Sequence, residues 1–321
     1  MFFSWQIFSW LGNGFLAYAN GANDNFKGVS TLYGSGVTTY RRALLWATLT
    51  TLLGSLTAIL FASALLATFS GKGLVPEVVL SLRSFPWAVA CAASVTVMLA
   101  TRLGFPISTT HALTGGLVGA GWVASSEGIN LAKLGSAFVL PLLVSPLLSL
   151  VCAALVYFAL NRFLKKNSPW LNRFHYFSAG AVCFSRALND TPKIAAILLA
   201  GSRLSPVLGF SLVASMMALG GLFHSRRIAE TLSHKVTEMS ESQGLISNIT
   251  TGILVIGASK IGLPVSTTHV ACGSLFGMGI VTKQAHYKMI LGIVLSWVIT
   301  LPVATLLGAL SFLLFKEGFG L

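Results

Sequence analysis

The chain has 321 residues, of which 55% are hydrophobic and only 9% are charged, and its mean hydropathy is +0.81. This composition excludes an ordinary soluble domain and predicts a protein that spans a lipid bilayer. The formal net charge of +13 would also suit a nucleic-acid-binding protein, but no basic run is longer than a pair, so nucleic acid is excluded as a partner.

Apolar runs long enough to cross about 30 Å of hydrocarbon predict the membrane spans. In the first half they cover residues 4–20 (broken, then resuming at 28–38), 44–69, 86–103, 106–124 and 133–160. In the second half they cover residues 174–188 (broken, then resuming at 192–202), 204–223, 245–260, 264–282 and 289–315. The two halves therefore repeat one pattern.

Five spans per half would place the second half upside down relative to the first. We therefore expect an all-α integral membrane protein with two inverted-topology repeats, whose broken helices or re-entrant segments meet at the bilayer midplane. The predicted units are repeat 1 (1–161), a cytoplasmic linker (162–172) and repeat 2 (173–321), which includes a cytoplasmic loop at 225–244. That loop is expected to be a plain polar connector.

Basic residues in the connections predict the orientation. Twelve fall on one side of the predicted spans and six on the other, and the richer side should be cytoplasmic. Both termini are then extracellular or periplasmic, in a multi-pass protein of the cell membrane. The first apolar run has no basic start and is interpreted as a retained span rather than a signal peptide. The four cysteines lie in apolar stretches without paired spacing, so neither a disulfide nor a cofactor is expected.

The hexapeptides Pro106–His111 and Pro264–His269 differ at one aliphatic position. A proline favours a helix start, where hydroxyl and backbone N–H groups can hold an anion. The six candidate anion ligands are Ser108, Thr109, Thr110, Ser266, Thr267 and Thr268. Such hydroxyls often bond only to their own helix, but the duplication favours a ligand site. His111 and His269 are predicted to orient neighbouring groups, with a proton-relay role left open.

A second duplicated motif, Asn-Asp-x-x-Lys, lies at each predicted helix break. Its members are Asn23, Asp24 and Lys27 in the first half and Asn189, Asp190 and Lys193 in the second. A carboxylate inside a bilayer costs at least about 2.5–3.5 kcal/mol, so each aspartate needs a lysine, a cation or a proton. An ion pair that only fixes packing is the alternative, although such pairs stabilise folds poorly.

With these motifs the chain resembles the inorganic phosphate transporter (PiT) family over nearly its whole length. The resemblance rests on the Gly-Ala-Asn-Asp signature, on Gly34–Val37, on Asn189-Asp190 and on both Pro-x-Ser-Thr-Thr-His segments. It implies a cation-driven symporter of phosphate, built from inverted repeats and usually a homodimer. It also implies that the Ser and Thr ligands, with Asn23 and Asn189, hold the anion. The groups assigned to the coupling cation are Asp24, Asp190, Asn25, Thr191, Lys27 and Lys193.

One departure from the family concerns the coupling ion. Sodium-coupled members carry small or amide residues where this chain has Lys27 and Lys193, and a tethered ammonium could fill the space of a sodium ion. The hypothesis is proton coupling, or fewer sodium ions; sodium near Asp24 and Asp190 is the other option. Metal is otherwise not expected.

The predicted function is secondary active symport of inorganic phosphate with a proton or sodium, by alternating access in membrane lipid. A sulfate permease of the same family is the alternative, because sulfate is also a tetrahedral oxyanion. An intramembrane phosphoesterase is a remote alternative: two matching half-sites and no acidic metal cluster do not make an asymmetric catalytic centre. We therefore expect a transporter and not an enzyme.

Overall fold

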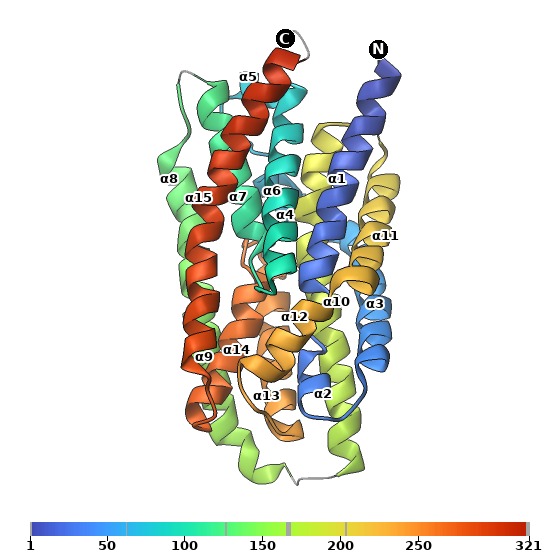
Figure 1. The fold of residues 1–321 in the computed structure, drawn as a ribbon, viewed down its shortest axis with the longest axis vertical. Coiled ribbons are helices and arrows are strands. Elements are labelled where there is room, and N and C mark those ends of the chain that lie inside the picture. The colour runs from blue at the N-terminus through green and yellow to red at the C-terminus, as the bar shows by residue number, and fades with distance from the viewer. Residues whose placement is uncertain (1, 62, 126, 165–167, 203, 319–321) are drawn as a thin grey trace.

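The computed structural model describes residues 2–61, 63–125, 127–164, 168–202 and 204–318; of these, the side chains of 2–10, 169, 317 and 318 are not described. This part of the chain is all-helical, with two isolated bridges in place of any sheet. The bundle is elongated, and α1 (Phe2–Asp24) and α15 (Tyr287–Gly318) bring the two termini to the same end (Figure 1). Lys165, Lys166 and Arg203, which entered the orientation argument, lie outside the described residues.

The helices follow one another with short connections. The remaining ones in the first half are α2 (Ser30–Gly34), α3 (Tyr40–Thr57), the 3-10 turn η1 (Ala58–Leu60), α4 (Ser63–Phe69), α5 (Glu77–Leu80), α6 (Ser84–Leu103), α7 (Thr109–Ala124), α8 (Leu131–Leu134), the π turn η2 (Gly135–Val139), α9 (Leu140–Leu160) and the 3-10 turn η3 (Asn161–Phe163). The remaining ones in the second half are α10 (Pro169–Ala200), α11 (Pro206–His224), α12 (Arg226–Glu230), the π turn η4 (Thr231–Lys235), α13 (Glu241–Lys260) and α14 (Thr267–Val281).

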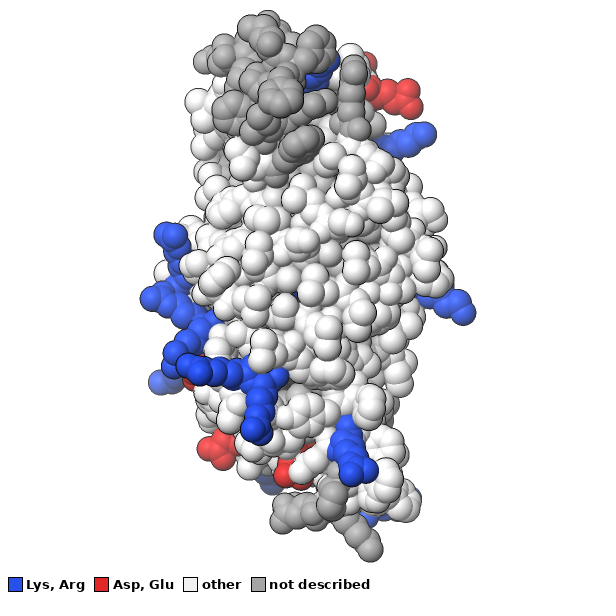
Figure 2. All heavy atoms as spheres, turned by 90° about the vertical axis from the view of Figure 1, so that its right-hand side faces the viewer, with Lys and Arg blue, Asp and Glu red and all other residues white. Residues whose placement is uncertain are grey.

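The surface is that of a membrane protein. Within the described residues, five helical stretches are long and apolar enough to cross a bilayer: Tyr40–Leu60, Ser84–Leu103, Leu131–Phe163, Pro206–His224 and Tyr287–Lys316. Large aliphatic side chains stand exposed along α3, α9 and α15, where only lipid would favour them. On the face in Figure 2, charged side chains lie along the edges and toward the two ends and leave a broad uncharged area at the centre. The expectation of a multi-pass membrane protein is confirmed.

Four of the predicted spans form two helical hairpins. The first hairpin consists of α6 and α7, and the second consists of α13 and α14. The segment before α6 meets the segment after α7, where Asn130 N donates to Leu74 O, so this hairpin opens toward the end that holds the termini. The segments flanking α13 and α14 meet through His286 N and Val236 O, and that hairpin opens at the opposite end (Figure 1). The duplicated hexapeptides, which follow the two turns, are buried except for the partly exposed His111.

The helices of the two halves pack across one another. α7 lies along α15 while α14 lies along α9, and α1 lies along α11 while α10 lies along α3. Each contact therefore joins a helix of the first half to one of the second, and it recurs with the halves exchanged. Buried residues of both halves also share apolar clusters, for example Leu16 with Ile194 and Phe26 with Ala179.

One predicted helix break occurs and the other does not. α1 ends at Asp24, and α2 begins at Ser30 after a turn. The expected break at Asn189-Asp190 is wrong, because α10 runs without interruption through both residues and through Pro192. Proline removes one helical hydrogen bond, but helices tolerate it where neighbours pack around them, and α10 contacts α3, α11 and α13.

The segment 225–244 is more ordered than the plain connector that we expected. It contains α12, η4 and the first turn of α13, and the side chains of Ile228, Leu232 and Val236 are buried. These apolar residues pack with helix α14 and with Trp297 of α15. The segment is therefore part of the packed bundle.

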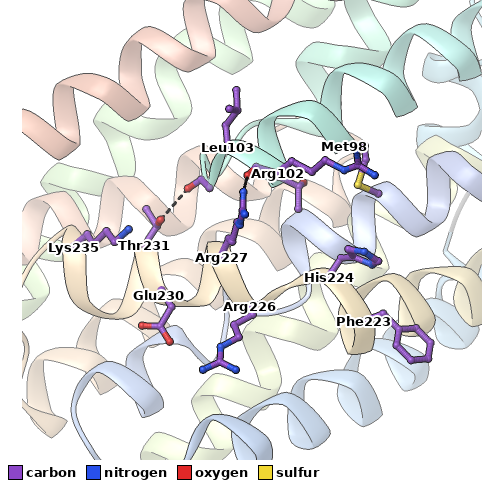
Figure 3. A pocket seen from close by; sticks show the side chains of 12 residues that line it. Met98, Arg102, Leu103, Phe223, His224, Arg226, Arg227, Glu230, Thr231 and Lys235 are labelled. Carbon is purple, nitrogen blue, oxygen red and sulfur yellow. Dashed lines mark hydrogen bonds between the residues drawn. The ribbon is translucent and has the colours of Figure 1, made fainter.

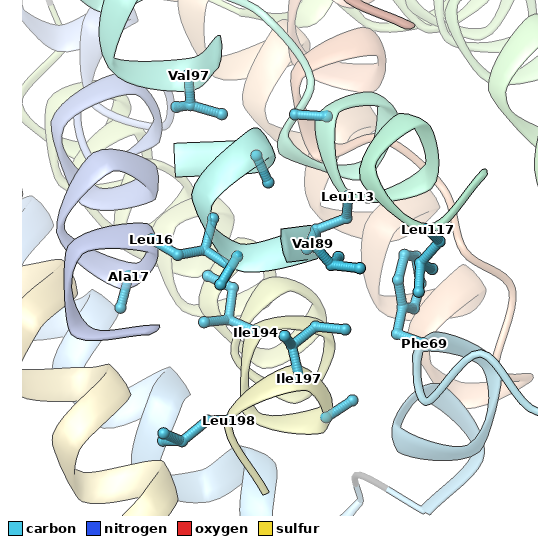
Figure 4. Close-up of a cluster of buried hydrophobic side chains, with 14 of the residues drawn as sticks. Leu16, Ala17, Phe69, Val89, Val97, Leu113, Leu117, Ile194, Ile197 and Leu198 are labelled. Carbon is cyan, nitrogen blue, oxygen red and sulfur yellow. The ribbon is translucent and has the colours of Figure 1, made fainter. Parts of the chain in front are cut away.

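The largest apolar cluster lies around α6 and α10 (Figure 4). It joins Leu16 of α1, Val89 of α6, Leu113 of α7 and Ile194 and Ile197 of α10, all buried. This cluster fixes the helices that carry the Asn-Asp motifs against the first hairpin, so the polar residues between them have fixed positions.

Candidate functional site

The ammonium of Lys27 lies in a shell of oxygen atoms. Nζ contacts Asp24 Oδ1 at 2.5 Å, Asn23 Oδ1 at 3.0 Å and the carbonyl of Ile107 at 3.1 Å, and it also donates to Thr268 Oγ1. Lys27 and Asp24 are only 3% and 1% exposed. The i,i+3 spacing of the motif brings these two side chains together, as predicted.

Lys193 has a corresponding environment in the second half. Its Nζ contacts Asp190 Oδ1 at 3.1 Å, Thr110 Oγ1 at 2.9 Å and the carbonyl of Val265 at 2.8 Å. Each lysine therefore reaches the hairpin turn of its own half through a carbonyl and that of the other half through a threonine hydroxyl.

The two asparagines of the motif bond differently. Asn23 binds the first hairpin on both sides of its turn, since it donates to Thr101 and to the Phe105 carbonyl and accepts from Ile107 N. Asn189 donates to Ser259 Oγ at 2.7 Å, but its buried Oδ1 has no hydrogen-bond partner.

The residues four positions before the aspartates complete the cluster. Asn20 donates to Asp24 Oδ2 at 3.2 Å and to Thr109 Oγ1 at 3.0 Å. Its counterpart Arg186 lies 3.7 Å from Asp190 Oδ2 and donates to Asn20 Oδ1 at 3.1 Å. Sequence reasoning did not include Asn20 and left Arg186 undecided. Their i,i+4 spacing from Asp24 and Asp190 is the signal that could have found them.

The serines of the hexapeptides start their helices. Ser108 Oγ accepts from His111 N, and Ser266 Oγ accepts from His269 N, each at 3.1 Å. Both are N-caps, so α7 and α14 begin at the site with their N-terminal N–H groups.

Of the four threonines that follow, Thr110 and Thr268 carry contacts between the halves, whereas Thr109 and Thr267 bond within their own half. Thr268 Oγ1 donates to the Ile107 carbonyl at 2.7 Å, and Thr110 Oγ1 donates to the Val265 carbonyl at 3.4 Å. Thr267 Oγ1 donates to Asp190 Oδ2 at 3.1 Å. The hydroxyls thus already bind charged and polar groups rather than only their own helices.

Buried charge at this cluster is unbalanced. Three cations, Lys27, Lys193 and Arg186, face two carboxylates, Asp24 and Asp190, and all five side chains are at most 3% exposed. The formal sum is +1. An isolated buried charge is costly, so the cluster is suited to a bound anion.

Two predicted site residues point elsewhere. The side chain of Asn25 bonds to Thr48 and Thr51 of α3, and Thr191 Oγ1 donates to Ser55 Oγ of the same helix at 2.9 Å. The structure brings neither side chain to an aspartate. Both side chains therefore bond to α3. Thr51 of this helix also accepts a hydrogen bond from Arg186, which connects α3 to the buried cluster.

The two histidines lie behind the threonines and contact each other. The ring centroids of His111 and His269 are 4.7 Å apart, and His269 stacks on Trp297 at 4.0 Å. His269 Nδ1 bonds to the Leu142 carbonyl at 3.0 Å, whereas His269 Nε2 and His111 Nδ1 are buried without partners. Neither ring contacts the aspartates through a hydrogen bond that the structure records.

A basic cavity of about 790 Å³ lies between the end of α6 and the α12–η4 segment (Figure 3). Its charged lining comprises Arg102, Arg226, Arg227, Glu230 and Lys235. Arg227 donates to the Arg102 carbonyl, and Thr231 Oγ1 donates to the Gly104 carbonyl at 2.9 Å. Thr101 also lines the cavity, and its hydroxyl accepts a hydrogen bond from Asn23. A single hydrogen bond therefore links the wall of this cavity to the buried cluster.

Known proteins resemble this chain over nearly its full length. "Probable low-affinity inorganic phosphate transporter" of Rhizobium meliloti is 28% identical over 93% of this chain and 92% of its own length. A protein of the same name from Mycobacterium tuberculosis is 27% identical over 92% of this chain and 74% of its own. A solved structure, "The sodium-dependent phosphate transporter", shares the fold with a TM-score of 0.85 at 23% identity, covering 98% of this chain and 99% of that one.

A family model covers most of the chain as well. The model of the phosphate transporter family matches residues 20–308, a range that includes every candidate site residue named above. The resemblance inferred from the motifs is confirmed, and so is the expectation of a transporter rather than an enzyme. The chain belongs to the phosphate transporter family.

Proposed function

We propose that this protein carries inorganic phosphate across the cell membrane together with a cation, and that the cation is a proton. The observation that supports this most directly is the meeting of two hairpin turns from opposite ends of the bundle at one buried cluster with an excess positive charge. Two helix N-termini, threonine hydroxyls and three cations are the groups that bind a tetrahedral oxyanion. The anion site comprises Ser108, Thr109, Thr110, Ser266, Thr267 and Thr268, with Asn23 and Asn189 beside it.

The lysines support the proton as coupling ion. Carboxylate, amide, carbonyl and hydroxyl oxygens surround Lys27 Nζ, and such oxygens at helix ends are what a sodium ion would otherwise bind. The ammonium already supplies the positive charge there. Coupling by sodium near Asp24 and Asp190 is the alternative.

Asp190 gives a physical route from proton to phosphate. Its carboxylate holds Lys193, Arg186 and the Thr267 hydroxyl, which are the same groups that an anion would use. A proton on Asp190 removes its negative charge and releases these groups to the anion. Proton and phosphate then bind better together than apart, which is the thermodynamic condition for symport.

The arrangement of the halves supports alternating access as the mechanism. The contacts of α7 with α15 and of α14 with α9 recur under exchange of the halves, which supports two inverted repeats. The end with α2, α12 and the start of α13 carries most of the connecting basic residues, so we assign it to the cytoplasm and both termini to the outside. A homodimer in membrane lipid is part of the proposal.

Uptake by purified protein in proteoliposomes tests the function. Labelled phosphate should accumulate when a proton gradient is imposed without sodium, and a sodium gradient at equal pH should add nothing. Uptake that requires sodium and ignores the proton gradient would replace the proton by sodium. Absence of phosphate uptake under both gradients, from liposomes shown to hold folded protein, would reject phosphate transport.

Sulfate is the competing substrate. Near neutral pH phosphate can donate a hydrogen bond and sulfate cannot, so acceptors such as Asp24 and Asp190 beside the anion favour phosphate. Unlabelled sulfate in tenfold excess should leave phosphate uptake nearly unchanged. Complete competition would favour the sulfate permease.

A further inference from the structure

An apolar crevice of about 510 Å³ lies between α9 and α15, directly behind the hairpin turns. Its walls come from helices that expose aliphatic side chains, and Leu143, Leu147 and Val298 at its rim are 63%, 66% and 65% exposed. The volume is within the range of small-molecule sites, roughly 300–1,000 Å³. The crevice therefore opens toward the hydrocarbon of the membrane.

The floor of this crevice is polar at one place. His111 and His269 both line it, and His269 Nε2 is buried without a hydrogen-bond partner in a residue that is 3% exposed. Buried polar atoms are nearly always paired, so an unpaired one in a residue that lines a cavity indicates a missing partner. Water would be a poor partner because the remaining lining is mainly aliphatic and aromatic.

The bonded side of the ring defines the chemistry of that partner. His269 Nδ1 contacts the carbonyl of Leu142 at 3.0 Å, and a carbonyl can only accept. Nδ1 therefore carries the hydrogen of the neutral imidazole, and Nε2 presents a lone pair. The missing partner must be a hydrogen-bond donor.

We propose that this crevice binds a membrane amphiphile with a neutral hydroxyl headgroup and a long alkyl chain, whose O–H donates to His269 Nε2. The histidines directly follow the buried Ser-Thr-Thr segments of the two hairpins, where a charged phospholipid headgroup would be costly. A neutral hydroxyl and an alkyl chain match the donor requirement and the apolar walls.

The position of the histidines connects this ligand to transport. His269 follows Thr268 in the first turn of α14, and His111 follows Thr110 in the first turn of α7. An occupant of the crevice touches both turns from behind, and it should slow their separation. This consequence rests on the proposed function, whereas the binding site itself does not.

Photolabelling of the full-length protein in liposomes tests the binding. A long-chain alcohol with a diazirine in its chain should label peptides of α9, α14 and α15, and its methyl ether, which cannot donate, should label them about 2- to 10-fold less, the usual net worth of one hydrogen bond. Leu143→Trp and Val298→Trp, which fill the rim, should abolish this labelling. Folding of each variant is checked by its melting temperature.

The chain supplies its own control. A second apolar crevice of about 520 Å³, between α9 and α13, has no histidine, and the hydroxyls of Ser136 and Ser145 in it are already bonded to backbone carbonyls. Alcohol and ether should label this crevice equally. Equal labelling of the histidine crevice by both probes, or labelling that survives both tryptophans, would overturn the proposal. So would conversion of a dimer to monomers by Leu143→Trp, since a second copy would then be the occupant.

Discussion

Lys27 and Lys193 each place an ammonium group among oxygen atoms, between an aspartate and the turn of a hairpin. The ion pair alone would not explain them, since buried pairs are roughly neutral for stability. What distinguishes them is their contact with both hairpins at once. At the scale of single residues, the protein therefore depends on a few buried charges whose partners belong to different halves.

Removal of the Lys27 ammonium tests whether it occupies a cation site. Lys27→Ala leaves the carboxylate of Asp24 buried without its closest cation, and we expect a loss of about 3–5 kcal/mol in stability. Sodium should bind the vacated oxygens and restore part of the melting temperature, while N-methylglucamine should not. Wild type and Lys260→Ala, which alters an exposed lysine, should show no sodium effect. Identical sodium responses in all three would contradict the assignment.

The hydroxyl of Thr110 is expected to matter for phosphate affinity. Thr110→Val keeps the shape but removes a group that accepts from Lys193, and hydrogen bonds to charged groups are worth about 1.5–3 kcal/mol, so the KM for phosphate should rise about 10- to 100-fold. Thr114→Val on the same helix is the control, because Thr114 Oγ1 donates to its own helix at the Thr110 carbonyl. Equal KM values for the two variants would remove Thr110 from the site.

At the scale of helices, contacts between the halves depend on close backbone approach. A Cβ atom added at Gly119 of α7 would lie 1.8 Å from the carbonyl oxygen of Thr305 on α15. Small residues at such positions let membrane helices pack closely. The glycine-rich stretch after the first hexapeptide therefore serves the packing of α7 on α15.

Gly119→Ala should consequently separate α7 from α15. Overpacking of this kind costs about 1–3 kcal/mol, and the melting temperature should fall by several degrees. Gly257→Ala in α13 is the matched control, since no atom lies within 4 Å of its added Cβ, and there alanine should be neutral or stabilising by up to about 1 kcal/mol. If the Gly119→Ala protein is as stable as the Gly257→Ala protein, close packing of α7 on α15 at Gly119 does not contribute to the free energy of unfolding.

At the scale of the whole molecule, the α12–η4 segment bonds to the first hairpin on the side that we assign to the cytoplasm. Thr231 Oγ1 donates to the carbonyl of Gly104 at the end of α6, and Ser233 Oγ donates to the carbonyl of Ser30, the first residue of α2, at 2.9 Å. The α12–η4 segment thus bonds both to the first hairpin and to α2, the helix that follows the break after α1. In the proposed alternating-access cycle, opening toward the cytoplasm would require these bonds to break.

Thr231→Val removes one of them. We expect backbone amides of residues 102–108 to exchange hydrogen several-fold faster in the variant, measured by mass spectrometry, because local opening becomes easier. The corresponding peptide 260–266 of the second hairpin has no contact with Thr231 that the structure records and should be unchanged. Equal acceleration in both peptides would indicate that the substitution destabilises the whole protein rather than the contact between the α12–η4 segment and the first hairpin.

Much of the site could be predicted from sequence because its residues are adjacent in the chain. Asp24 and Lys27 are three residues apart, and Ser108 caps the first turn of α7 by accepting a hydrogen bond from His111 N. Their contacts follow from helix geometry alone. The contacts of Lys27 with Thr268, and of Arg186 with Asn20, join residues from opposite halves and depend on how the whole bundle packs.

Sequence by itself determined that this protein lies in a membrane and that two polar motifs each occur twice along it, because hydropathy and repetition are properties of the chain. Only the tertiary structure decided that α10 continues through Asn189-Asp190, that segment 225–244 is packed, and that the histidines border an apolar crevice. A proline or a polar pair signals a helix break locally, but the neighbours that satisfy these groups come from distant parts of the chain. Their positions are set by packing, which no local pattern encodes.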